Sequence, residues 1–132
     1  MRLAALATPV LFTAAVSIRA IGLRRTSVVL ARLLARPTRG QRVQEPVRVV
    51  AAVDLIAGRL PATACMERSV TSWILLHRHG HAASLMVGAP AGGLGAEFRA
   101  HAWVEVDGSP VGESPELLDK FVRLGDPLAT KP

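Results

Sequence analysis

Tyrosine is absent from this chain of 132 residues, and its aromatic side chains are limited to three phenylalanines and two tryptophans. Proteins that bind single-stranded nucleic acid commonly stack the bases on aromatic rings, so the composition argues against nucleic acid as a partner. Cysteine occurs once, at Cys65. A single cysteine excludes an internal disulfide and is compatible with a reducing compartment. We therefore predict a cytoplasmic protein.

A long uninterrupted apolar run is also missing. Residues 3–17 follow Arg2 and imitate a signal peptide, but Pro9 interrupts them and no small-residue cleavage site precedes a polar sequence. A bilayer-spanning helix needs about 20 apolar residues, and this run is shorter. We expect a buried or partner-facing helix, with binding at a membrane surface as the lesser alternative.

Apolar residues make up half of the chain and charged residues a fifth, which is typical of a folded domain. The net charge of +6 is unevenly distributed. Residues 1–49 contain nine arginines and one acid, Glu45, whereas residues 50–132 are slightly acidic. The simpler interpretation is a set of solvated arginines on short helices, and the alternative is an acidic partner. We predict an N-terminal basic helical region over residues 1–46 and a second domain over residues 47–132.

Apolar periodicity and capping residues predict four helices. Two prolines and a glycine mark residues 37–46 as a linker. Thr63 can cap the fourth helix, which places Cys65 in its first turn, and Gly80 is a suitable C-terminal cap. The first three predicted helices cover residues 3–22, 26–35 and 47–60, and the fourth runs from the Thr63 cap to a last turn that contains Arg78 and His79.

Beyond Gly80 the apolar residues alternate, as is typical of strands. A turn follows at residues 107–109, and the sequence Ser114-Pro115-Glu116 can open a short helix. Helices followed by an antiparallel sheet indicate an α+β fold. The predicted strands cover residues 82–87, 97–106 and 110–113, with a glycine-rich loop at residues 90–95.

Cys65 and His101 are the candidate reactive pair. The first turn of a helix presents unpaired N–H groups and the positive end of its dipole, which favour thiolate over thiol. A histidine on a facing strand can take the thiol proton and so generate a nucleophile. The alternative for Cys65 alone is that it is a small core residue.

A carboxylate on the neighbouring strand can orient the histidine, and Glu113 is the candidate. A three-residue turn at residues 107–109 places Glu113 opposite Trp103, on the face of His101 and one diagonal step away. A two-residue turn places Glu113 opposite Ala102, on the other face. The predicted triad of Cys65, His101 and Glu113 therefore depends on a three-residue turn.

Metal ions and cofactors are not expected. His77, His79 and His81 are spaced like metal ligands, but alternate residues at a helix end point apart. Trp73 and Trp103 are expected in the core. Arg68 is expected to pair with Glu67 or Glu105.

Two motifs resemble those of the transglutaminase-like leader peptidases of lasso-peptide biosynthesis. They are Cys65-Met66-Glu67-Arg68-Ser69 before a helix rich in Trp and Leu, and His101-Ala102-Trp103-Val104-Glu105 before Gly112-Glu113. The resemblance covers roughly residues 47–125. It implies a papain/transglutaminase-like fold and a cysteine peptidase with a Cys-His-Asp triad. Cys65 matches the nucleophile, His101 the base, and Glu113 replaces the aspartate.

The resemblance also implies a reaction and partners. The substrate would be a ribosomally made precursor, from which the enzyme removes the leader peptide before a separate cyclase closes the core into a ring. A small leader-binding protein would deliver the precursor, and the basic N-terminal region could dock this protein or the leader. Two alternatives are transfer of the acyl group to an amine and a non-catalytic peptide-binding module on the same fold.

Overall fold

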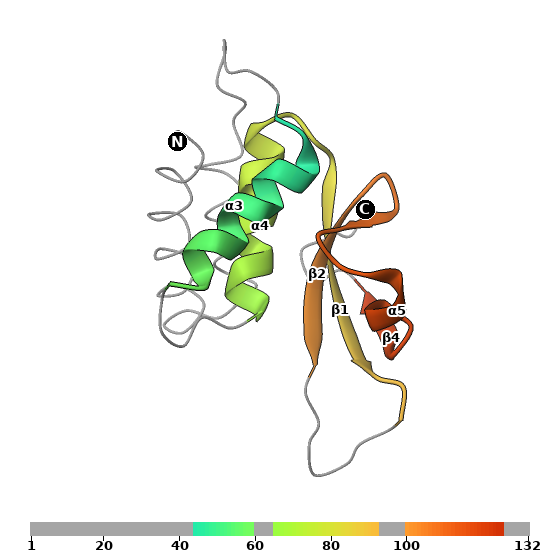
Figure 1. Ribbon diagram of the computed structural model, residues 1–132. Coiled ribbons are helices and arrows are strands. Elements are labelled where there is room, and N and C mark those ends of the chain that lie inside the picture. Colours follow the sequence, from blue (N-terminus) through green and yellow to red (C-terminus); the bar gives the residue numbers. More distant parts are fainter. Residues whose placement is uncertain (1–43, 60–64, 93–99, 126–132) are drawn as a thin grey trace, which may run out of the picture.

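The computed structural model describes residues 44–59, 65–92 and 100–125. Several predicted features lie outside these residues, namely the two helices before residue 37, most of the 37–46 linker, the Thr63 cap and much of the glycine-rich loop. Within the described part, two helices lie on one side of an antiparallel sheet, and α5 lies on the other side, next to the edge strand β4 (Figure 1). This is the predicted α+β arrangement.

Helix α3, Pro46–Ala57, has proline in its first turn, where no N–H is needed for the helix. Its buried side chains recur at three- and four-residue intervals and pack against α4. Val49, Val50, Val53 and Ala57 are buried, and Ile56 packs against the core cluster to which the three valines belong.

Helix α4, Cys65–Arg78, begins at the candidate nucleophile. It ends as predicted at Gly80, which has a φ of 84°. The N–H of His81 donates to the carbonyl of Leu76 at 3.0 Å, and the N–H of Gly80 donates to His77 at 3.0 Å, which satisfies carbonyls left free by the helix end. Helix α4 contacts β1 and β2, so it forms the layer directly over the sheet.

The sheet has four strands in the order β3-β2-β1-β4, and every neighbouring pair is antiparallel. The two central strands are β1, Ala83–Pro90, and β2, His101–Val106. Leu85 and Val104 are cross-strand partners on the face that packs against the helices. Because side chains alternate along a strand, His101 and Trp103 lie on the opposite face.

A two-residue turn joins β2 to β3, Ser109–Val111, and the predicted three-residue turn is wrong. Val106 pairs with Ser109, which leaves Asp107 and Gly108 as the turn. Both have positive φ, 53° and 76°. This combination is the hairpin turn that Asp-Gly favours, because its twist matches that of the strands.

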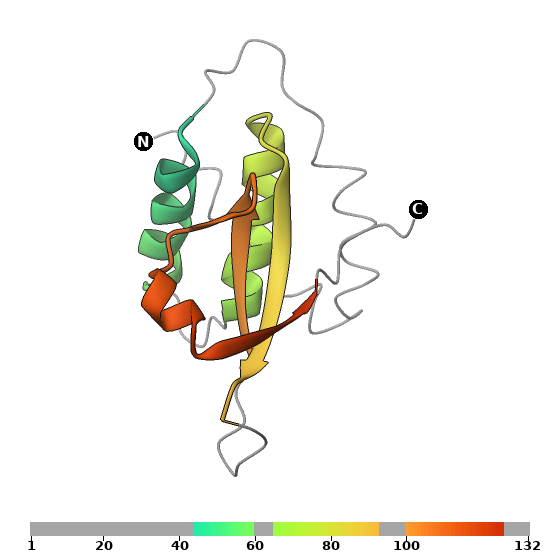
Figure 2. The ribbon, with the colours of Figure 1, turned by 90° about the vertical axis from the view of Figure 1, so that its right-hand side faces the viewer.

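The C-terminal part of the described chain crosses the far face of the sheet. Ser114 caps the short helix α5, Pro115–Leu118, by accepting from the N–H of Leu117 at 3.2 Å, as predicted. Strand β4, Phe121–Gly125, then pairs with β1. In Figure 2 β4 passes in front of the lower ends of β1 and β2, with α4 behind these strands and α3 to their left. No strand was predicted here.

No helix within the described residues is long and apolar enough to cross a membrane.

Candidate active site

The first turn of α4 contacts the backbone of β2. The Cys65 thiol donates to the carbonyl of Ala100 at 3.9 Å, and the Ser69 hydroxyl donates to the carbonyl of Ala102 at 2.9 Å. Residues four apart share a helix face, so one side of α4 supplies both donors. These contacts fix the helix start against the strand that carries His101.

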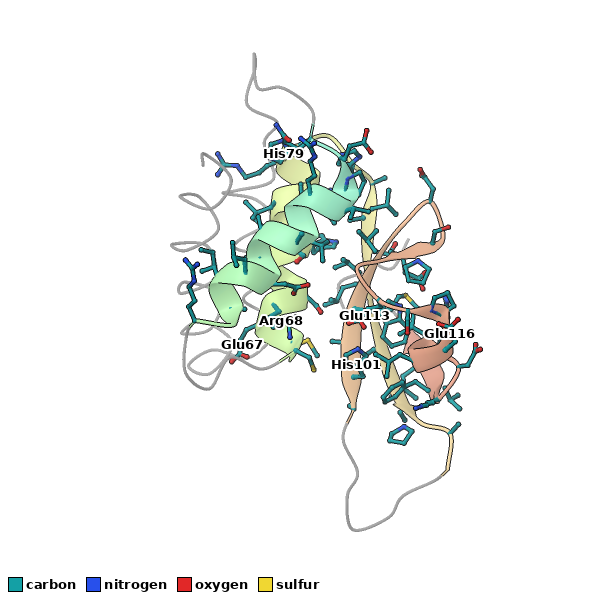
Figure 3. The ribbon with its side chains drawn as sticks, in the orientation of Figure 1. Glu67, Arg68, His79, His101, Glu113 and Glu116 are labelled. Carbon is teal, nitrogen blue, oxygen red and sulfur yellow. The ribbon has the colours of Figure 1, made fainter. Side chains whose placement is uncertain are left out.

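His101 and Glu113 contact each other directly. Nε2 of His101 lies 3.1 Å from Oε1 of Glu113, and about a fifth of each side chain is exposed. A carboxylate can only accept a hydrogen bond, so Nε2 carries the proton. Nδ1 of the neutral ring is then the nitrogen that can accept one. Figure 3 shows the two labelled residues side by side at β2.

Glu113 reaches His101 although the turn has two residues, the length expected to place Glu113 on the face of the sheet opposite His101. Strand β3 ends at Val111, and the following Gly112 has a φ of 76°. Strand alternation therefore stops before Glu113, and the inference about its face does not apply. A Cβ at Gly112 would also lie 2.6 Å from Cγ1 of Val50 on α3. Glycine is thus required here for both conformation and space.

One pocket contains Cys65, His101 and Glu113 together. The pocket lies beside the start of β2, which has no partner in β3. Pairing with β3 covers only Val104–Val106, the second half of β2. The pocket is partly open to solvent, with a cavity volume of about 30 Å³. The remaining lining residues are Val50, Asp54, Arg68, Ser69, Ser72, Ala102, Trp103, Val104, Val111 and Gly112.

Two aromatic rings hold the imidazole of His101. The Trp103 ring stacks with it at a centroid distance of 5.9 Å and an angle of 24°, and the Phe121 ring lies 5.2 Å away. Gly88 permits this packing, since a Cβ there would lie 2.9 Å from both Cβ of Phe121 and Cζ3 of Trp103. The imidazole is therefore confined by rings from two strands as well as by Glu113.

An ion pair between buried Glu105 and half-exposed Arg123 lies next to Trp103. The indole N–H donates to Oε1 of Glu105 at 3.0 Å, and Arg123 donates to both carboxylate oxygens, at 2.8 and 3.1 Å. The guanidinium carbon also lies 6.0 Å from the centre of the Trp103 ring. Glu105 is 5% exposed, and a buried charge needs compensation. The Arg123 guanidinium supplies the opposite charge, and the Trp103 indole adds a hydrogen bond. Trp103 is in the core, as predicted, with 2% exposure.

Arg68 pairs with Asp54, not with Glu67 or Glu105 as predicted. Its Nε and Nη2 lie 3.1 and 2.5 Å from Oδ1 of Asp54. The pair joins α4 to α3. Residue spacing along one chain could not identify a partner on another helix.

The histidines near the end of α4 bind backbone groups. Nε2 of His77 lies 3.0 Å from the carbonyl of Ala83, which also accepts from the indole of Trp73 at 2.9 Å. Nε2 of His81 lies 2.6 Å from the carbonyl of Gln44. Within the described ranges no cluster of three or more His, Cys, Asp or Glu could hold a metal ion.

Sequence reasoning missed Phe121 and Arg123, because it predicted no strand after α5. Gly112 was part of the quoted motif, and its place next to Glu113 was the available signal. The structure brings Cys65, His101 and Glu113 to one pocket. Their catalytic roles stay a prediction.

Comparison with protein families matches residues 9–125 to the Transglutaminase-like superfamily. Neither the curated proteins nor the solved structures contain a match to this chain. The family match spans most of the chain, including the described α3, α4 and all four strands. The superfamily includes cysteine peptidases and acyltransferases, and both use the kind of chemistry that a cysteine beside a histidine provides. The chain therefore belongs to the transglutaminase-like superfamily.

Proposed function

We propose that this protein is a cysteine peptidase that removes the leader peptide from a lasso-type precursor. The observation that carries the proposal is the pocket shared by Cys65 at the start of α4 and by the hydrogen-bonded pair His101 and Glu113. The superfamily supports thiol-based acyl chemistry. The two sequence motifs that resemble the leader peptidases support the particular substrate.

Each of the three side chains has a defined role in this proposal. Glu113 accepts from Nε2–H of His101, which leaves Nδ1 to take the proton of the Cys65 thiol. The thiol contacts the Ala100 carbonyl, and His101 lies on the other face of β2. The mechanism therefore requires the thiol to turn past the unpaired edge of β2 toward the ring before it reacts. Cys65 is the first residue of α4, at the helix end whose N–H groups have no partner within the helix.

The reaction follows in two steps. Sγ of Cys65 attacks the carbonyl carbon at the leader–core junction, and the proton held by His101 passes to the leaving amine as the C–N bond breaks. The leader is then joined to Cys65 as a thioester. His101 takes a proton from water, which attacks the thioester and restores the thiol. The products are a leader with a carboxylate end and a core with a free amine for the cyclase.

Leader recognition is assigned to a partner protein. We propose that a small leader-binding protein delivers the precursor in the cytoplasm and that the basic region before residue 47 docks it. Reversing the charges of Arg24, Arg25 and Arg32 together should weaken cleavage of the full-length precursor while the fold is retained. Unchanged cleavage would reject this docking role.

Mass spectrometry of the precursor, incubated with enzyme and leader-binding protein, tests the proposed function. Loss of the leader with gain of one water supports hydrolysis. The superfamily also includes acyltransferases, so the same reaction is run with an added primary amine, and an amine adduct would support acyl transfer. An unchanged precursor would support a peptide-binding module.

Two variants link cleavage to the pocket. Cys65→Ala and His101→Ala should each abolish cleavage and leave binding of the precursor intact. Ser84→Ala is the control, because Ser84 is exposed on β1 and carries no contact in the pocket. If cleavage survives either active-site change, that residue has no part in the mechanism.

A further inference from the structure

The face of the sheet opposite α3 and α4 carries a continuous row of contacts that ends at His101. His101, Trp103 and Glu105 alternate along β2 and share this face. Each contacts the next, first by ring stacking and then by the hydrogen bond from the indole to the carboxylate. The row continues to Arg123 on β4 through the two contacts of its guanidinium.

This row fixes Trp103 from several directions. Glu105 holds the indole nitrogen, and Arg123 lies over the ring face. The Trp103 ring occupies the space that a side chain at residue 88 would take, since its atoms lie 2.9 Å from the position of a Cβ on Gly88. These contacts at its edge and over its face hold the Trp103 ring in one orientation. The imidazole of His101 stacks against this ring.

Glu105 supplies the carboxylate in this row, and it requires the Arg123 guanidinium as its partner. Glu105 is 5% exposed, whereas the Arg123 side chain is 53% exposed. A buried carboxylate without a compensating charge is costly and rearranges or draws in water. Removing the guanidinium therefore releases Glu105, and with it the acceptor that fixes the indole of Trp103.

We propose that Arg123 and Glu105 are positioning residues for His101. They act through Trp103 and hold the imidazole at the angle where Nε2 meets Glu113 and Nδ1 is free for the thiol. Phe121 and Arg123 both come from β4, so the strand that follows α5 completes the support of the imidazole. The inference rests on the proposed function in that Cys65 and His101 react as a pair.

Alkylation of the thiol by iodoacetamide at pH 7 tests the proposal without a peptide substrate. The chain has one cysteine, so the label reports Cys65 alone. Arg123→Gln should slow alkylation by about 10-fold, because a misdirected imidazole takes the thiol proton less readily. Arg123→Lys keeps a charge near Glu105 and should recover part of the rate, which a loss of fold stability alone would not produce.

The matched control is Arg59→Gln. Arg59 is exposed after α3 and has no ion pair among the described residues, so its rate should equal that of the wild type. The indole N–H signal of Trp103 in a ¹H–¹⁵N spectrum is the second readout, and it should move in Arg123→Gln and in Glu105→Gln but not in the control. Glu105→Gln keeps the side-chain volume, so it serves if Arg123→Gln fails to fold.

The outcomes separate this proposal from the proposed function. Equal alkylation rates and an unmoved indole signal in folded Arg123→Gln or Glu105→Gln would overturn the positioning role, even if the wild type cleaves the precursor. A slowed rate and a moved signal would support it, even if the precursor stays intact and the peptidase assignment fails.

Discussion

His101 at the start of β2 and Glu113 beyond the end of β3 share a hydrogen bond of 3.1 Å. The pairing of β2 with β3 ends at Val104 and Val111, so it does not extend to these two residues. The bond forms because the backbone leaves its strand conformation at Gly112. From this backbone position the Glu113 carboxylate reaches Nε2 of His101. The side-chain length of Glu113 and the conformation of Gly112 are therefore linked.

Glu113 should be important for turnover. Replacing it with alanine removes the acceptor that fixes the tautomer of His101, and we expect kcat for precursor cleavage to fall by about 10²-fold or more, within the up to about 10⁴-fold known for orienting acids. Glu113→Gln retains an acceptor of the same length and should lose less. Steady-state kinetics of cleavage measures both.

Glu116→Gln is the control for Glu113. It removes a carboxylate three residues away, at an exposed position in α5 with no ion pair among the described residues. Its kcat should match that of the wild type. If Glu113→Ala behaves like this control, the hydrogen bond to His101 has no role in the reaction.

Gly112 should be less replaceable than other glycines with positive φ. Alanine at residue 112 would be strained in the left-handed conformation, at a cost of about 1–2 kcal/mol. Its methyl group would also lie 2.6 Å from Val50. This overpacking adds a loss of about 1–3 kcal/mol in the free energy of unfolding. Gly108 has the same φ of 76° and nothing within 4 Å of its Cβ position. Gly108→Ala therefore measures only the free-energy cost of the left-handed backbone conformation.

Urea unfolding of the two alanine variants measures the difference. The free energy of unfolding should fall more for Gly112→Ala than for Gly108→Ala, by the overpacking term. Equal losses would mean that α3 yields at Val50 and that space at Gly112 is not restricted.

The sequence predicted the elements whose signals are local. Helices α3 and α4 follow from apolar spacing, and the caps at Gly80 and Ser114 follow from residue type. Asp107-Gly108 also contained the signal for a two-residue turn, whereas the predicted turn covered residues 107–109. Glu113 reaches His101 with the shorter turn because Gly112, at positive φ, ends the alternation of faces.

The support of His101 could not be predicted in the same way. Strand β4 has one partly buried residue, Phe121, followed by four exposed ones, so no alternation marks it as a strand. The pairings of Arg123 with Glu105 and of Arg68 with Asp54 join different elements. Spacing along the chain is informative about one element, and contacts between elements depend on how they pack.

Gly88 should be required for the packing of the rings that hold His101. In Gly88→Ala the methyl group would meet Phe121 and Trp103 at 2.9 Å, and we expect a loss of about 1–3 kcal/mol with a changed near-ultraviolet dichroism of the tryptophans. Gly92→Ala is the control, because nothing lies within 4 Å of its Cβ position and it has no positive φ. A dichroism spectrum unchanged in Gly88→Ala would show that the rings can move aside without rearrangement.

The ion pair between Asp54 and Arg68 should contribute little to stability although it lines the pocket. Both donors of Arg68 reach the same oxygen of Asp54, and the two side chains are 42% and 39% exposed. Half-exposed pairs contribute about 0.2–1 kcal/mol because water and ions screen them. A double-mutant cycle of Asp54→Asn and Arg68→Gln, followed by urea unfolding, should give a coupling energy in this range. Salt at 1 M, where the screening length is about 3 Å, should reduce it further. A coupling that is larger and insensitive to salt would mean that the pair is shielded from water and holds α3 against α4 near Cys65.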